Sequence, residues 1–224
     1  MSEQLILAID TSTRASVGVV GSDAPVAVSR REVQHRHGTH VLEQIDEVLD
    51  AAGRTLDELS ALAVGTGPGS FTGLRVGMAT AKTIAYAREL PLVGVMSSDA
   101  LRRAAAEAGG EPEAAVVLPA GARDHYLAAA AADPVLISPG DLEAALAGGP
   151  AISIDMDDDL LGAEAARLGT AAVEGLAAVL ISSARERLAA GHADDVAGLV
   201  PAYVALPRGV KRATEELGWS PDLR

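Results

Sequence analysis

The sequence contains no cysteine, which excludes a disulfide framework, a thiolate metal site and a thiol nucleophile. Aromatic residues make up only 2% of its 224 residues, so no series of rings is available to stack on nucleic-acid bases. Basic residues are also scarce, with 18 lysines and arginines against 31 aspartates and glutamates and a formal net charge of −13. Because phosphate backbones attract proteins that neutralise them, we expect contact with nucleic acid only through a partner.

The start of the sequence has the pattern of neither a signal peptide nor a membrane span. The first apolar run, Leu5–Ile9, lacks a basic flank and ends at Asp10. We therefore expect a cytoplasmic protein without membrane attachment. With 49% hydrophobic residues, the chain can bury a substantial core, as one large domain or as two small lobes.

In the first half of the chain, short apolar runs alternate with helical periodicity. Residues 41–52 carry apolar side chains on one helical face and acidic side chains on the other, and Gly53 follows them. The pattern predicts strands at 4–10, 17–20, 26–28, 61–65 and 92–95 and helices at 39–52 and 73–89. This alternation indicates an α/β fold in which helices pack on a mixed sheet.

The second half shows the same alternation after an alanine-rich helix at 100–108. It predicts strands at 116–118, 126–131, 135–137 and 151–154 and helices at 141–146 and 170–190. We expect two related lobes, a first at 1–100 and a second at 101–206. Residues 207–224, which include the single tryptophan Trp219, are expected to form a mobile tail.

A glycine-rich segment, Gly65-Thr-Gly-Pro-Gly-Ser-Phe-Thr-Gly, lies between a predicted strand and a predicted helix. Glycines at such a turn let the backbone approach another group closely, and the following helix N-terminus favours anions. Gly67 and Gly69 are therefore candidate nucleotide contacts, as are Asp10, Thr11 and Ser12 after the first strand. The segment lacks the Lys-Ser/Thr of a P-loop and the G-x-G-x-x-G spacing, so close packing remains the alternative to phosphate binding.

The helix after this segment carries small residues at every fourth position, from Gly73 through Gly77 and Ala81 to Ala85. Such a stripe lets another helix approach closely, which favours a contact with a partner through the helices at 39–52 and 73–89. The interface candidates are the following residues: Val41, Leu42, Ile45, Gly73, Leu74, Gly77, Met78 and Ala81.

Other polar residues have simpler interpretations. His35, His37 and His40 precede an amphipathic helix without a carboxylate or cysteine at metal-site spacing, so we predict no metal site. Ser70 lacks the G-x-S-x-G context of a hydrolase nucleophile and is expected to cap the helix. Asp157-Asp-Asp is interpreted as a solvated acidic turn, and no catalytic residue is assigned.

Three segments, ILAIDTST, GTGPGSFTGLRVGMATAKTIAYARELPLVGV and LVPAYVALPR, resemble the TsaB family of tRNA threonylcarbamoyladenosine biosynthesis subunits. The resemblance implies a two-lobed actin-like, Hsp70-like ATPase fold with mixed sheets flanked by helices. It also implies a role in threonylcarbamoylating adenosine 37 of tRNAs that read codons beginning with A. The implied partners are the catalytic paralog TsaD, through it the ATPase subunit TsaE, and tRNA only indirectly.

The catalytic paralog carries an H-x-x-x-H metal-ligand pair just after a segment similar to PLVGV, where this chain has Met96-Ser-Ser-Asp-Ala100. Met and Ala cannot replace two imidazoles as metal ligands. The second lobe is also altered, with Gly121-Ala-Arg-Asp-His-Tyr126 in place of a D-A-R-x-x-E-x-Y signature. We therefore expect a non-catalytic scaffold without a resident cofactor, which pairs with the paralog and forms a homodimer when isolated.

A second interpretation stays open. The same fold supports nucleotide-binding ATPases and kinase-like enzymes, in which Asp10 would act near a metal-bound phosphate, and ATP or ADP could also bind at a subunit junction. A proteolytic or chaperone-like role has no nucleophile, metal set or peptide groove in the sequence to support it.

Overall fold

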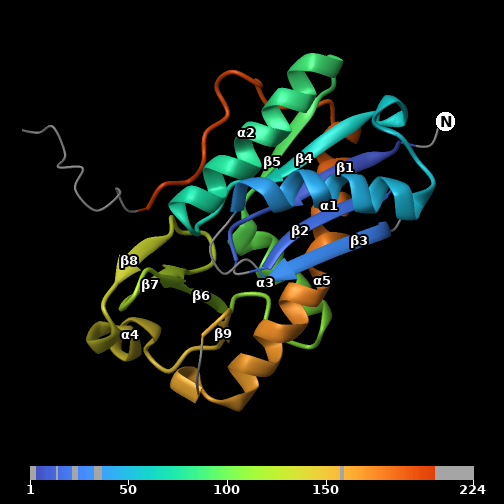
Figure 1. Ribbon diagram of the computed structural model, residues 1–224. Helices are drawn as coiled ribbons and strands as arrows, with labels where there is room; N and C mark the ends of the chain where they lie inside the picture. The colour runs from blue at the N-terminus through green and yellow to red at the C-terminus, as the bar shows by residue number, and fades with distance from the viewer. Residues whose placement is uncertain (1–3, 14, 22–24, 33–36, 157–158, 205–224) are drawn as a thin grey trace, which may run out of the picture.

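The computed structural model describes residues 4–13, 15–21, 25–32, 37–156 and 159–204. Figure 1 shows two lobes, each built on its own sheet, with helices on both faces of the larger sheet. The tail 207–224 and Trp219 lie outside the described residues.

The first lobe contains a five-stranded mixed sheet in the order β3-β2-β1-β4-β5. The strands β1 (Ile6–Asp10), β2 (Ala15–Gly21) and β3 (Pro25–Glu32) form an antiparallel meander. The strands β4 (Ala61–Gly65) and β5 (Leu92–Val95) run parallel to β1. Parallel neighbours need crossover helices, and α2 (Phe71–Arg88) supplies the connection between β4 and β5.

Alternating side chains of the first sheet enter two different cores. Leu7 and Ile9 face α1 (His37–Ala52) and α2, while Ile6 and Ala8 face the helices on the opposite side. This period of two is the geometric consequence of a pleated strand. Because helices cover both faces of the sheet, its central strands β1 and β4 are buried along their whole length.

The second lobe contains a four-stranded sheet in the order β8-β7-β6-β9. Its strands are β6 (Ala115–Ala120), β7 (Asp124–Ala128), β8 (Val135–Ile137) and β9 (Ala151–Ser153). The helix α3 (Ser97–Glu107) connects the two sheets, and α4 (Pro139–Leu146) follows β8. Arg102 on α3 is buried and donates hydrogen bonds to the carbonyls of Ala114 (2.9 Å) and Ala128 (2.8 Å), which fixes this helix to the second sheet.

The longest helix, α5 (Ala163–Ala189), belongs to both lobes. It contacts β9 near its start and then runs behind the first sheet, where it packs along α3. Its length and composition alone would suit a membrane span. Half of its most apolar window is buried inside the protein, and residues such as Leu176 and Leu180 belong to the main core, so it serves here as a core helix.

The chain then returns to the first lobe through a strap, defined here as residues 191–204. The strap runs beside β5 and α2 (Figure 1), with a bridge between Asp194 and Leu92. Lys82 donates hydrogen bonds to two strap carbonyls, of Ala197 (2.9 Å) and Leu199 (3.1 Å). These polar contacts tie the strap to the first lobe, whereas the sequence placed it in the second lobe at 101–206.

The order of the strands and helices agrees with the sequence patterns, but several ends differ. The largest difference is at α5, which begins seven residues before the expected start at 170. Gly169 lies inside this helix. A Cβ there would come 1.7 Å from the carbonyl oxygen of Ser153, so the position requires glycine. This glycine is thus a point of close contact between α5 and β9.

Candidate functional site

Three segments converge where the parallel strands of the first sheet end. β1 ends at Asp10, β4 continues into the glycine loop (residues 65–70), and β5 leads into the start of α3 at Ser97. The carboxyl ends of parallel strands are the usual place for a binding site in α/β proteins. The predicted nucleotide candidates Asp10, Thr11, Ser12, Gly67 and Gly69 lie together at this edge.

The carboxyl group of Asp10 is fully buried and used internally. One oxygen accepts hydrogen bonds from the backbone N–H of Ser12 (2.8 Å) and from its hydroxyl (2.5 Å). The other oxygen accepts a hydrogen bond from the Ser97 hydroxyl (2.6 Å), which itself accepts one from the N–H of Gly67 (3.1 Å). The acid thus joins the ends of β1, β4 and β5.

Burial raises the pKa of Asp10 above its ordinary value, and the hydrogen bonds from Ser12 and Ser97 offset part of that rise. Desolvation disfavours the charged form of a carboxyl group, whereas donors directed at it favour that form. Among the described residues, no lysine or arginine contributes to the shift. The arrangement resembles a structural polar junction more than a carboxylate prepared to bind a cation.

The glycines of the loop allow two very close approaches. A Cβ at Gly65 would lie 1.8 Å from Oδ2 of Asp10, and a Cβ at Gly69 would lie 2.4 Å from the carbonyl oxygen of Ser12. The loop therefore packs directly on the turn after β1, and Thr11 and Ser12 are almost fully buried. Close packing explains these glycines without a phosphate, and nucleotide binding by these residues remains a prediction.

The small-residue stripe of α2 faces the same turn. Thr11 donates a hydrogen bond to the carbonyl of Gly73 (2.8 Å), and a Cβ at Gly77 would lie 2.4 Å from the Thr11 hydroxyl oxygen. Ser70 caps the helix as predicted, since its hydroxyl accepts from the N–H of Gly73 (3.3 Å). The stripe thus packs against the turn after β1 rather than against a helix of another protein.

This packing buries most of the predicted interface set. Seven of the eight candidates are buried within the first lobe: Val41, Ile45, Gly73, Leu74, Gly77, Met78 and Ala81. Leu42 alone is exposed, at 57% of its surface. Apolar periodicity identified the inner faces of α1 and α2, which cover the sheet, and a partner could reach only their outer faces.

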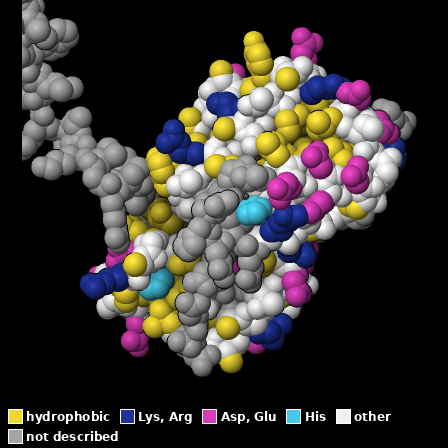
Figure 2. All heavy atoms as spheres, in the orientation of Figure 1, with side chains coloured by type: hydrophobic (Ala, Val, Ile, Leu, Met, Phe, Trp, Pro, Cys, Tyr) yellow, Lys and Arg dark blue, Asp and Glu magenta, His cyan; other side chains and the backbone are white. Residues whose placement is uncertain are grey.

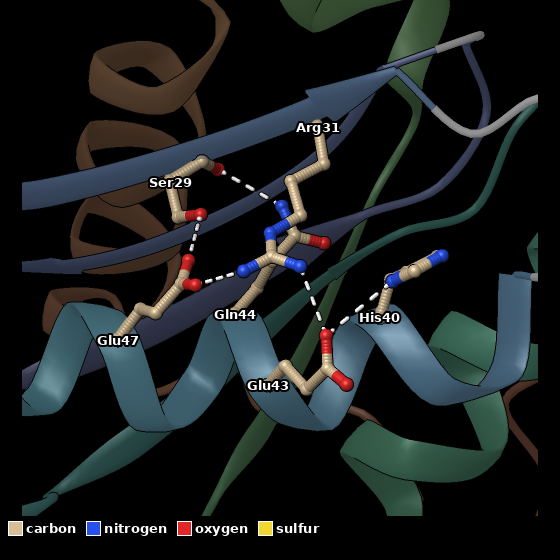
Figure 3. Close-up of polar contacts among 6 residues, drawn as sticks. All are labelled: Ser29, Arg31, His40, Glu43, Gln44 and Glu47. Carbon is tan, nitrogen blue, oxygen red and sulfur yellow. Dashed lines mark hydrogen bonds and ion pairs between the residues drawn. The ribbon is translucent and has the colours of Figure 1, made fainter.

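The outer face of α1 is acidic. Glu43, Asp46, Glu47 and Asp50 are exposed there beside Leu42, and Figure 2 shows acidic side chains gathered over this helix. In Figure 3, Arg31 on β3 bridges Glu43 (2.9 Å) and Glu47. This charge pattern would suit a partner surface that carries basic groups.

The histidines near α1 and the acidic turn are described only in part. His40 lies 3.4 Å from Glu43, His35 lies outside the described residues, and the side chain of His37 is not described. Within the part of the chain that the structure describes, no group of three histidines or acids could hold a metal ion. In the acidic turn 157–159, Asp157 and Asp158 lie outside the described residues, as does the side chain of Asp159.

Sequence reasoning missed the role of Ser97. This residue lies in the segment that was compared with the metal ligands of the catalytic paralog, and there only the missing histidines were considered. Ser97 and Ser98 are both buried at the start of α3, where their backbone N–H groups donate to the carbonyl of Gly67. This burial could have been suspected, because the two serines follow an apolar strand closely. The partner of the Ser97 hydroxyl, 87 residues away, could not.

Comparisons with known proteins agree with this architecture. A protein from Pseudomonas aeruginosa described as similar to peptidase YeaZ superposes with a TM-score of 0.68, at 21% identity, over 90% of this chain and all of that one. The structure described as YeaZ from the same organism gives 0.65 at 22% identity, over 89% and 99% of the two chains. The expected two-lobed α/β fold with mixed sheets flanked by helices is confirmed.

The sequence comparisons are more specific. The tRNA threonylcarbamoyladenosine biosynthesis protein TsaB of Escherichia coli is 39% identical over 90 residues, which are 40% of this chain and 39% of that protein. The protein of the same name from Haemophilus influenzae is 38% identical over 108 residues, 48% and 45% of the two. The chain thus spans less than half the length of these curated relatives in the matched regions. Residues 28–154, more than half of the chain, match the family model described as TsaD, tRNA N6-adenosine threonylcarbamoyltransferase, and the chain therefore belongs to this family, with TsaB proteins among its relatives.

Proposed function

We propose that the chain is a non-catalytic accessory subunit of the assembly that forms N6-threonylcarbamoyladenosine at position 37 of tRNAs reading codons that begin with A. The family match over residues 28–154 carries this proposal. The names of the TsaB relatives point to the same pathway. The net charge of −13 supports an indirect role toward tRNA, because the chain would repel a phosphate backbone.

The residues around Asp10 support an accessory role rather than a catalytic one. Met96 and Ala100 occupy the positions where the paralog's two histidines are expected. Ser97 between them is buried and bonded to Asp10. A site whose acid is held by serine hydroxyls and covered by the glycine loop offers neither metal ligands nor an accessible base. We include the lack of a resident cofactor in this proposal.

The partner surface that we propose is the outer side of α1 and α2. The two helices pack side by side on the first sheet (Figure 1), and each presents an exposed apolar side chain, Leu42 at 57% and Tyr86 at 82% exposure. A partner of similar fold could place its own two helices there, in a pseudo-twofold pair. In this arrangement the chain is cytoplasmic, pairs with the catalytic paralog and, through it, meets the ATPase subunit.

The experiment that tests the function is reconstitution of tRNA threonylcarbamoylation from the catalytic subunit and its accessory proteins, with and without this chain. We expect modification to depend on the chain, while the chain alone turns over no ATP. Full modification in its absence would contradict the proposal. ATP turnover by the isolated chain, lost in Asp10→Ala, would favour the nucleotide-binding alternative.

The partner surface is tested by a matched pair of charged substitutions. Leu42→Arg places a cation on the exposed face of α1 and should weaken co-purification with the catalytic subunit. Val135→Arg makes the same change at a position of similar exposure, 51%, on β8 of the second lobe, and should leave pairing intact. Equal effects of the two substitutions on co-purification would show that α1 does not form the interface. Sedimentation of the isolated chain over a range of concentrations tests the expected homodimer.

A further inference from the structure

A hollow of about 540 Å³ lies in the second lobe, at the lower end of the molecule in Figure 1. α4, the first turns of α5 and the short helix Asp159–Leu161 enclose it, together with the loops at 109–111 and 148–151. It lies in the lobe that carries neither α1 nor α2. Its properties can therefore be examined separately from pairing through the first lobe.

One part of the wall of this hollow is formed by leucines, because the hollow lies where two cores meet. Leu142, Leu146 and Leu161 belong to a small cluster under the second sheet, and Leu168 on α5 belongs to the main core. Protein interiors are otherwise packed with few voids larger than a water molecule. A hollow of this size falls within the range of sites that hold small organic ligands, which spans roughly 300–1,000 Å³.

The charged residues that line the hollow are acidic. Among the described residues, three glutamates line it, Glu111, Glu143 and Glu164, without a lysine or arginine. Arg167 binds Glu164 through two hydrogen bonds (2.9 and 2.7 Å), which lowers the pKa of that carboxyl group. Within the described part of the chain, Glu111 and Glu143 form no ion pair. An aliphatic wall next to two unneutralised carboxylates complements an apolar molecule with a positive group.

We propose that this hollow binds a small organic cation, with its apolar body against the leucines and its ammonium or guanidinium group near Glu111 and Glu143. Glu164 contributes less because Arg167 already neutralises it. The site is independent of tRNA modification and requires no chemical step. It adds a ligand-binding role for the second lobe to the accessory role of the whole chain.

The test uses three compounds with the same alkyl chain, octylammonium, 1-octanol and octanoate, titrated into the full chain by calorimetry below their aggregation limits. We expect octylammonium to bind best and octanoate worst, because only the head group differs. Equal binding of all three would overturn the proposal, as it would show a hydrophobic surface without charge selection. No binding of octylammonium would overturn it as well.

Two sets of variants locate the bound molecule. Glu111→Gln and Glu143→Gln should each weaken octylammonium binding by about two- to fivefold, the range of an exposed ion pair, and leave octanol binding unchanged. Glu113→Gln is the control, since it removes an exposed charge from the same loop as Glu111 without lining the hollow. Ala165→Leu, which fills part of the space, should weaken all alkyl compounds while the thermal midpoint stays near wild type. Binding unaffected by the two glutamine variants would place the cation elsewhere and refute the site.

Discussion

Replacement of Gly65 by alanine tests whether the strand ends are held together by Asp10. The added Cβ would lie 1.8 Å from Oδ2 of Asp10, 2.6 Å from its Cγ and 2.7 Å from the Ser97 hydroxyl oxygen. No rotation of the methyl group avoids these contacts. The carboxyl group must therefore leave its place, and its hydrogen bonds with Ser12 and Ser97 are lost.

The expected cost combines two terms. Forcing an extra carbon into a packed interior costs about 1–3 kcal/mol, and each lost hydrogen bond to a carboxyl group adds roughly 1–2 kcal/mol. Relief of the buried acid's desolvation offsets part of this sum. We expect a net loss of about 3–5 kcal/mol in the free energy of unfolding, which lowers the thermal midpoint by roughly 10 °C for a chain of this size.

Urea denaturation of Gly65→Ala measures this loss, and Gly18→Ala serves as its control. A Cβ at Gly18 on β2 meets its nearest neighbour, the Cβ of Gln44, at an ordinary 3.5 Å. The control should therefore change stability by no more than about 0.5 kcal/mol. A loss below about 1 kcal/mol for Gly65→Ala would show that the carboxyl group is not held where the structure places it.

A double-mutant cycle identifies the cause of the loss. Asp10→Ala removes the atoms that Gly65→Ala would displace, so the second substitution should cost much less in that background. The remaining contact, with the Ser97 hydroxyl, can be relieved by rotation of that side chain. Additive costs of the two substitutions would refute the proposed clash.

Three further predictions concern other parts of the fold. Arg102→Met leaves the buried carbonyls of Ala114 and Ala128 without their donor and should cost about 2–4 kcal/mol in urea denaturation; a loss under 1 kcal/mol would contradict this. Burial raises the pKa of Asp194, but hydrogen bonds from Arg187 and the Gly94 N–H bring this pKa below its ordinary 3.8. The stabilisation by the Asp194 carboxylate is therefore present above pH 3.8 and is lost as the pH falls through the lowered pKa. The difference in thermal midpoint between wild type and Asp194→Asn should shrink on acidification, and a constant difference would disagree. Asp10, whose pKa is raised, has the opposite sign: its stabilisation is full below 3.8 and lost as the pH rises through the raised value, so wild type should gain relative to Asp10→Asn on acidification in the same measurement.

The alternation of strands and helices could be predicted from the sequence because each element carries its own period. The acidic and apolar faces of α1 and the continuous apolar runs of β1 and β4 are local patterns. Asp10 and the glycine loop could also be marked as candidates, since each directly follows a predicted strand. These features depend only on residues close together in the chain.

The contacts that decide the use of the site could not be predicted. The Ser97 hydroxyl bonds to Asp10, which lies 87 residues away in the sequence, and no local pattern predicts such a pair. The apolar face of α2 would look the same whether it covered its own sheet or another subunit, which is why the interface set included Met78 and Ala81, two residues that are buried within the first lobe. The strap has almost no regular structure, so periodicity could not assign it to the first lobe.

The strap also determines how the molecule would respond to a pulling force. Both ends of the described chain, near Leu5 and Val204, lie in the first lobe, because the chain leaves it through α3 and returns through α5. Force applied to these ends would act first on the strap's bond between Ala202 and Thr66 (2.8 Å), then on the contacts of Lys82, and last on the bridge between Asp194 and Leu92 (2.8 Å). The second lobe would bear no load until these contacts with the first lobe break, so it is mechanically sheltered by a segment that packs on its neighbour.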